Sequence, residues 1–389
     1  MDRSETVAAL RVLFDALQAG RMDEALERLG DIPDAAVMPD LWLACVQGAV
    51  MTARTDDDLD LYTGAIEAAE RALEILRGPE NAMRVGMIER YAGEAMHALA
   101  RHDNDIEELR TAIDHYDRSL NGLTGEDLRI ERAEAFFRRG CALNDIAHHE
   151  DDPRYSERAI ASWDQALPLV SKSDEPRLFV KLCTELGQAH ARLSMFDDDD
   201  ERLDKAIGML EQALSVPRGP EVARPLAEAR MALGAALLRR GKQRDDDDDL
   251  NRATAMLEAA ANGFERRDAN WSAAQNNLAV AHLVRAEGRE DPEPLRAAVA
   301  AFKRAQSIRS PKTDPRNWIN TQRNIGAALM TLAERIGDLA TAEESVVALE
   351  LAENEAPELQ PGALDAIRES LAAARTLATR LKRAGERPE

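Results

Sequence analysis

The stretch AIEAAERAL, from Ala65 to Leu73, is the first clear copy of a motif that recurs through most of the 389-residue chain. Close copies are AIDHYDRSL from Ala112, AIASWDQAL from Ala159 and AIGMLEQAL from Ala206, and weaker ones begin at Ala253, Ala298 and Ser345. Consecutive copies start 47 residues apart, except for one step of 45 between Ala253 and Ala298. A fixed period of this size indicates a repeat protein in which each unit is one supersecondary element.

A second motif has the same period and lies upstream of the first in each unit. It places a Gly or Ala two residues before another small residue, as in Gly93 with Ala95 and Gly140 with Ala142. Inside a helix, Gly costs about 1 kcal/mol relative to Ala. Its return at one position therefore indicates that another helix approaches closely there. The remaining members of the series are Gly48, Gly187, Gly234, Ala279 and Gly326.

Both motifs have the apolar spacing of a helix with one buried side, as Ile66, Leu73 and Leu76 illustrate. Pro and Gly, which end helices, separate one unit from the next, for example at Gly78-Pro79. Short acidic loops separate the two motifs within a unit. Each unit is thus predicted to be a pair of antiparallel helices, which we name helix A (the Gly motif) and helix B (the AI motif).

The ends of the chain depart from the repeat, as the caps of a solenoid must. Residues 1–40 are predicted to form an N-terminal capping helix pair, and residues 41–356 an array of about seven helix pairs. Residues 357–389 are predicted to form a C-terminal capping helix and tail. The predicted fold is all-α, a helical-hairpin repeat solenoid with a C-terminal capping helix.

The chain is acidic, with 72 acidic and 50 basic residues and a net charge of −22. Such a surface repels phosphate backbones, which argues against nucleic acid as the primary partner. The three cysteines are too few and too scattered for a disulfide framework or a zinc site. No basic region precedes an apolar run at the N-terminus, and no apolar stretch reaches the roughly 20 residues that span a bilayer. We expect a cytoplasmic protein with no signal peptide and no membrane contact.

The two motifs together resemble the tetratricopeptide repeat (TPR), which has Leu-Gly and then Ala on helix A, and Ala with a later Ala-Leu on helix B. The matching stretches include NLAVAH at 277–282, NIGAAL at 324–329 and AIEAAERAL at 65–73. The usual unit has 34 residues, whereas this one has 47, which resembles extended bacterial arrays. The resemblance implies a right-handed superhelix whose concave face is lined by the A helices.

The resemblance also selects candidate groove residues, because the family's concave face is formed by set positions on helix A. On this chain those positions are Arg90, Phe137, Asn144, Lys181, Gln188, Arg192, Arg239, Asn276, Asn320 and Arg323. Half of them are basic in an acidic protein, so an acidic segment or a chain terminus is a candidate ligand. The alternative is that these cations pair with Asp and Glu of neighbouring helices. The family's Lys and Asn set that clamps a C-terminal carboxylate is not reproduced.

Other residues were considered for chemistry. The Asp runs, such as Asp245–Asp249, lack the ligand order of a calcium loop and are interpreted as solvated caps at the N-termini of the B helices. His148 and His149 are adjacent on a helix and point about 100° apart, so a shared metal ion is disfavoured. Cys141 is interpreted as a packed thiol. The tryptophans at 271 and 318 are either repeat-packing residues or rings on which a ligand stacks.

Phosphate loops, nucleophile elbows and dinucleotide fingerprints are missing from the sequence. We therefore expect no enzyme, no catalytic residue, no cofactor and no metal. The leading hypothesis is a scaffold or adaptor that binds a protein or peptide along the concave groove. The alternatives are a regulator gated by a ligand or peptide, and a structural subunit that self-associates.

Overall fold

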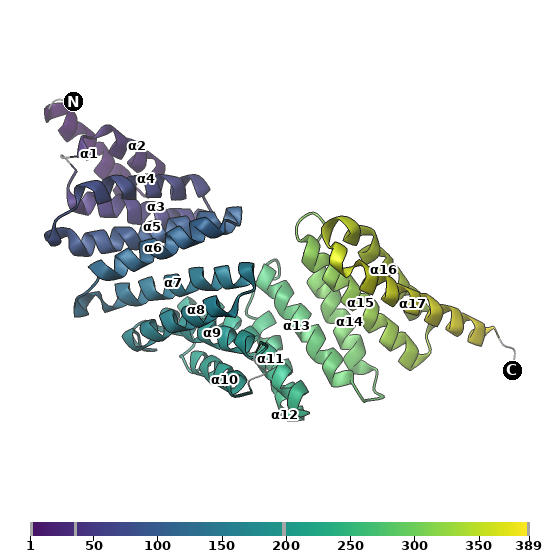
Figure 1. Ribbon diagram of the computed structural model, residues 1–389. Coiled ribbons are helices and arrows are strands. Elements are labelled where there is room, and N and C mark those ends of the chain that lie inside the picture. Colours follow the sequence, from purple (N-terminus) through teal and green to yellow (C-terminus); the bar gives the residue numbers. More distant parts are fainter. Residues whose placement is uncertain (1–2, 35–36, 197–199, 387–389) are drawn as a thin grey trace. The chain divides into compact units, whose positions relative to one another are not determined.

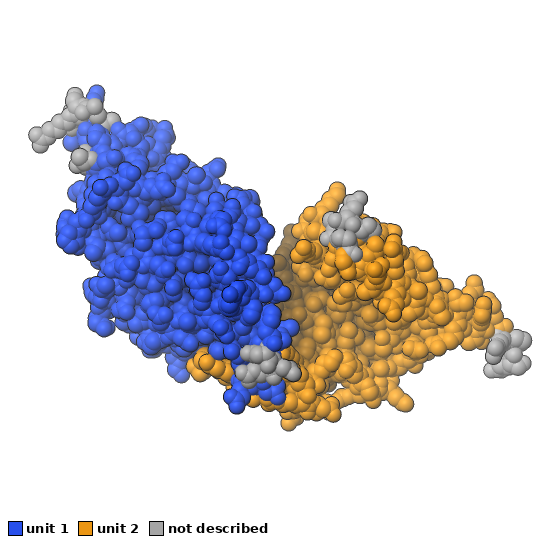
Figure 2. Space-filling model, in the orientation of Figure 1, with its two compact units in different colours: residues 1–202 blue, residues 203–389 orange. Residues whose placement is uncertain are grey.

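The computed structural model describes residues 3–34, 37–196 and 200–386 (Figure 1). Within these residues the chain forms seventeen α-helices joined by turns and short 3₁₀ segments, with no strand. The predicted all-α repeat solenoid is confirmed. The contacts divide the chain into two compact units, residues 1–202 and 203–389, which are coloured separately in Figure 2. The division into N-terminal cap, array and C-terminal cap stays a proposal.

Unit 1 contains an N-terminal helix pair followed by A and B helices in alternation. Its helices are α1 (Arg3–Gln18), α2 (Met22–Asp31), α3 (Pro39–Asp56), α4 (Leu59–Ile75), α5 (Ala82–Asp103), α6 (Ile106–Gly122), α7 (Arg129–Glu150), α8 (Pro153–Ala166) and α9 (Pro176–Leu193). The A helices are α3, α5, α7 and α9. Each packs against the helix before it, and α3, α5 and α7 also pack against the B helix after them. Neighbouring A helices also touch, as α5 does with α3 and α7.

Helix α10 (Asp200–Leu214) contains the boundary between the units. Unit 2 continues the alternation and ends on a single helix. Its helices are α11 (Ala223–Arg244), α12 (Asp247–Ala261), α13 (Ala269–Ala286), α14 (Glu293–Gln306), α15 (Pro315–Ile336), α16 (Leu339–Leu359) and α17 (Leu364–Gly385). α17 packs along α16 and also touches α15. None of the described helices is long and apolar enough to cross a membrane.

The repeated glycine packs against helix B of its own unit. A Cβ added at Gly140 would lie 2.3 Å from Nε1 of Trp163, and one at Gly326 would lie 2.5 Å from Cγ of Leu349. At Gly93, Gly140, Gly234 and Gly326 the partner is the fifth residue of the AI motif. That residue is Tyr116, Trp163, Leu257 and Leu349, respectively. The sequence predicted a close approach. The structure adds that the glycine makes room for this side chain of helix B.

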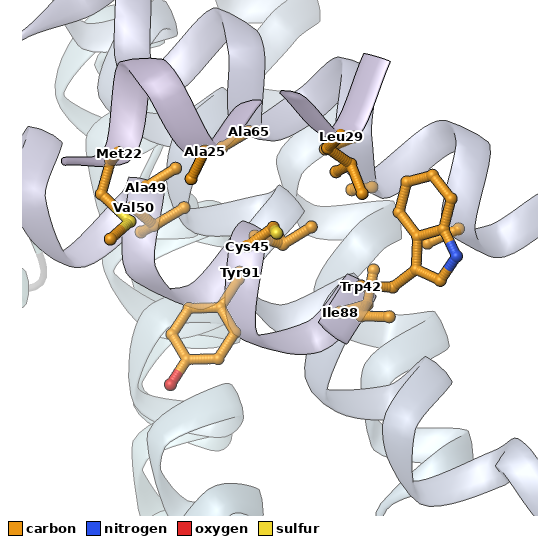
Figure 3. Close-up of a cluster of buried hydrophobic side chains, with 14 of the residues drawn as sticks. Met22, Ala25, Leu29, Trp42, Cys45, Ala49, Val50, Ala65, Ile88 and Tyr91 are labelled. Atoms are coloured by element: carbon orange, nitrogen blue, oxygen red, sulfur yellow. The ribbon is translucent and has the colours of Figure 1, made fainter. Parts of the chain in front are cut away.

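The first unit is the exception, because its fifth AI residue is the small Ala69. Here the space over Gly48 is filled from outside the repeat, since a Cβ at Gly48 would lie 2.6 Å from Sδ of Met22 on α2. Figure 3 shows the buried cluster that results, with Met22, Ala25 and Leu29 beside residues of α3 to α5. Helix α2 thus completes the core of the first helix pair.

The turn from helix A to helix B has one construction in five units. Helix A ends on a residue with positive φ, which is Asp57, Asn104, Asp151, Asp245 or Gly337. The next residue is always an Asp, whose side chain accepts hydrogen bonds from the first backbone N–H groups of helix B, as Asp58 does from Asp60 and Leu61 at 3.0 and 3.1 Å. The acidic loops predicted from the sequence therefore cap helices. The run at Asp197–Asp199 lies outside the described residues.

We expect Asp58→Ala to lower the free energy of unfolding by about 1 kcal/mol, because two N–H groups at the start of α4 lose their acceptor. The measurement is the urea midpoint followed by circular dichroism. Glu70→Ala is the control, since it removes the same charge from an exposed position further along α4. Equal effects of the two changes would show that charge, and not capping, is responsible.

Candidate functional site

The groove residue predicted on α5, Arg90, lies in a buried charge cluster. Arg90 is 7% exposed, stacks on Tyr91 with 4.1 Å from its Cζ to the ring centroid, and lies 3.9 Å from the carboxylate of Glu94. Glu94 also pairs with Arg54 of α3 at 3.0 Å and with Arg138 of α7 at 3.1 Å. Arg90 thus belongs to a network that joins three A helices, which matches the alternative of pairing between neighbours.

Two further predicted residues form a contact between α7 and α9. Nζ of Lys181 lies 5.9 Å from the ring centroid of the buried Phe137. Burial lowers the pKa of Lys181, and the positive charges of Arg138 and Arg177 lower it further. Gln188, also on α9, is exposed.

Asn144 and Arg192 are partners of each other. Nη2 of Arg192 donates to Oδ1 of Asn144 at 2.8 Å and also to the hydroxyl of Ser156 on α8. Burial lowers the pKa of Arg192. Arg192 therefore links α7, α8 and α9, and changing its charge would disturb this packing as well as any ligand. Arg239 is half-buried on α11 in unit 2.

The structure brings the last three predicted residues together. Asn276 of α13 and Asn320 and Arg323 of α15 line one cavity of about 430 Å³. We call this cavity the amide pocket, and its other lining residues are Ala273, Asn277, Arg309, Asn317, Thr321 and Asn324. Five asparagines and two arginines thus converge on it, and its described lining contains no carboxylate.

Arg309 anchors the amide pocket from the turn that follows α14. Its side chain is 9% exposed, and Nε lies 3.4 Å from a carboxylate oxygen of Asp314. Nη1 donates to the hydroxyl of Thr321 at 2.8 Å, which fixes the plane of the guanidinium. Burial lowers the pKa of Arg309. A buried guanidinium held in one plane is suited to a carboxylate that accepts two hydrogen bonds side by side.

Besides Thr321, the sequence missed four polar members of this pocket, for different reasons. Asn317 and Asn324 lie three residues before and four after Asn320, so helical spacing places all three on one face of α15. This spacing could have identified Asn317 and Asn324 from the sequence. Arg309 lies between helices, where the sequence predicted only a turn, and its position depends on how the turn folds. Asn277, next to Asn276, falls outside the family's set positions.

Comparison with known proteins supports the fold. No protein-family model and no curated protein matches the sequence. A solved structure of a Signal Transduction ATPase with Numerous Domains (STAND) protein with a tetratricopeptide repeat sensor, from Pyrococcus horikoshii, is 15% identical, with a TM-score of 0.57. The match covers 95% of this chain and 55% of that one, so this chain spans about half of that protein.

A second structure, a Rap protein complexed with Competence and Sporulation Factor, is 15% identical, covers 98% of both chains and has a TM-score of 0.43. At these identities the likeness concerns the fold alone. The chain is thus an all-α helical repeat solenoid. Its 47-residue period is a feature of the sequence.

Proposed function

We propose that this protein is a non-enzymatic scaffold that binds an extended peptide segment of a partner protein in the amide pocket. The observation that carries the proposal is the convergence of five asparagines and two arginines on one cavity of about 430 Å³. An Asn side chain carries one acceptor and two donors, so it can pair with the backbone of an extended peptide. An extended segment leaves its N–H and C=O groups unpaired, and an amide-rich lining satisfies them without selecting many side chains.

The charge of the pocket favours a segment with at least one acidic group. Arg323 and Arg309, of which Arg309 also lies 3.4 Å from the carboxylate of Asp314, line the cavity. The described lining itself contains no carboxylate, inside a protein of net charge −22. A side-chain carboxylate or a C-terminal carboxylate would complete this site through charge-assisted hydrogen bonds. We also propose that this protein is bacterial and that it acts in the cytoplasm. Two alternatives remain. The protein is a regulator gated by a bound ligand or peptide, or it is a structural subunit that self-associates.

The test is a selection from a library of random twelve-residue peptides, followed by fluorescence polarisation with the selected peptides. We expect enrichment of sequences with Asp, Glu or a free C-terminal carboxylate. Arg323→Gln should weaken their binding by about tenfold or more, because a charge-assisted hydrogen bond is lost. Asn320→Ala should also weaken binding, by a smaller factor.

Arg316→Gln is the matched control, since it removes the same charge from an exposed position on α15 outside the pocket lining. Its binding should equal that of the wild type. Selection of no peptide, or equal affinity of the selected peptides for the Arg323→Gln variant, would refute the proposal. Circular dichroism of each variant shows that helicity is retained.

A further inference from the structure

A second and larger cavity lies on the other face of α13. It measures about 780 Å³ and is formed by α12, the turn after it, α13 and α14. We call it the aromatic cavity, and the lining residues that matter here are Phe264, Arg266, Trp271, Gln275, His282 and Arg304. Its volume falls in the range of about 300–1,000 Å³ that is usual for small-molecule sites.

The aromatic cavity is separate from the amide pocket. Trp271, Gln275 and His282 recur at helical spacing and form one stripe along α13. Asn276 and Asn277, which line the amide pocket, lie on the opposite side of the same helix. A variant can therefore alter one site and leave the other unchanged.

Two aromatic side chains, Trp271 and Phe264, form one wall of the aromatic cavity. Trp271 and Phe264 are each 8% exposed and belong to one hydrophobic cluster with residues of α11 to α13. Packing against this cluster holds both rings in place, so their remaining exposed edges and faces are preorganised. Rigid aromatic surface of this kind is suited to a planar ring.

The polar part of the cavity consists mainly of hydrogen-bond donors. Nε of Arg304 donates to Oε1 of the buried Gln275 at 2.9 Å. This bond occupies the acceptor of Gln275 and leaves its NH₂ group, together with the terminal nitrogens of Arg304, as donors. The described residues form no ion pair with Arg304 or Arg266. Glu258 is the only carboxylate in the described lining, so the cavity has an excess of positive charge.

His282 adds no positive charge to this balance. Burial lowers its pKa, and the nearby Arg285 and Arg304 lower it further, so the imidazole is neutral at pH 7. The cavity thus combines a rigid aromatic wall with arginine and amide donors, and its net charge is complementary to an anion.

We propose that the aromatic cavity binds a small molecule that combines a planar aromatic ring with a carboxylate or phosphate group. The ring lies against Trp271 and Phe264, and the anionic group accepts hydrogen bonds from Arg304 and Gln275. This site is additional to the peptide site and does not depend on it. It agrees with one of the two roles that the sequence left open for the tryptophan at 271.

The test uses 1-naphthoate, 1-naphthyl phosphate and the uncharged 1-naphthalenemethanol as probes, with binding to the full chain measured by titration calorimetry. We expect saturable binding of at least one anionic probe, and the tighter of the two identifies the preferred anion. The uncharged probe should bind about tenfold more weakly, because it cannot use Arg304. Arg304→Gln should reduce the affinity for the anionic probe to that of the uncharged one.

Two controls locate the binding. Arg296→Gln removes the same charge from an exposed position of α14 outside the cavity lining, and Arg323→Gln changes the amide pocket; both should bind the probes as the wild type does. The proposal is overturned if neither anionic probe binds, if Arg304→Gln binds them unchanged, or if the uncharged probe binds equally well. Thermal unfolding of Arg304→Gln verifies that it is folded.

Discussion

Gly140→Ala is expected to destabilise the protein by about 2 kcal/mol, although it adds a single methyl group. The new Cβ would lie 2.3 Å from Nε1 of Trp163 and 2.6 Å from two ring carbons. Trp163 is completely buried, and its Nε1 donates to the backbone oxygen of Phe137 at 3.0 Å. The indole therefore cannot move away without losing a buried hydrogen bond. The measurement is the free energy of unfolding in urea.

Gly208→Ala is the matched control with the opposite expected sign. A Cβ at Gly208, in the middle of α10, would meet no atom within 4 Å. Replacement of an unhindered helical Gly by Ala stabilises a helix by about 1 kcal/mol. If both changes stabilise, the space over Gly140 is not restricted. In a double-mutant cycle, Gly140→Ala should cost less when Trp163 has been replaced by Ala, since the clashing ring is gone.

Arg240→Met is expected to lower the free energy of unfolding by about 3 kcal/mol at pH 7, because it leaves a buried carboxylate without its main partner. Arg240 of α11 binds Asp249 of α12 through two hydrogen bonds, of 2.6 and 2.9 Å, and also pairs with Asp204 at 2.9 Å. The side chain of Asp249 is only 5% exposed. Arg252, half exposed and 3.6 Å away, is a weaker substitute.

The loss of unfolding free energy in Arg240→Met should become smaller as the pH falls. The hydrogen bonds from Arg240 lower the pKa of Asp249 below its ordinary value of 3.8. A carboxyl with a lowered folded-state pKa stabilises the protein above that ordinary value, and this contribution disappears as the pH falls through the folded-state pKa. The difference in unfolding free energy between wild type and Arg240→Met should therefore be full at pH 7 and shrink below about pH 4.

Arg289→Met serves as the comparison for this prediction. Arg289 pairs with Asp247 at 2.6 Å, but both side chains are largely exposed. Exposed ion pairs contribute about 0–1 kcal/mol, so this variant should remain close to the wild type. A loss for Arg240→Met that matches that of Arg289→Met, or that does not change with pH, would contradict the role given to Asp249.

The repeat could be predicted from the sequence because its physical cause is local. The AI motif, the recurring glycine and the acidic loops each depend on residues near one another in the chain, and each corresponds to a feature of the structure. The side chain that packs against the glycine is distant from it in the sequence. Gly140 and Trp163 belong to different helices, and the side chain of α8 that fills the space could be identified only once the register of the two helices was known.

The candidate groove was predicted as one surface, and here the sequence was less informative. The family's set positions on helix A selected Asn276, Asn320 and Arg323, and all three line one pocket in the structure. Asn144 and Arg192 were selected as separate ligand contacts, but they bind each other across α7 and α9. Side-chain partners between repeats depend on rotamers and on helix spacing. Neither can be derived from a single sequence. The site residues stay a prediction until binding is measured.

The turn built from one left-handed residue and one Asp has a consequence for how such a chain can evolve. Asp58, Asp105 and Asp152 begin consecutive B helices at intervals of 47 residues, and the residue before each has nearly the same positive φ. Recombination between two such turns would join segments whose backbones already agree in conformation, so a whole unit can be duplicated or lost without a new connection. The array can then change in length by crossover while the chemistry of each remaining pocket stays intact.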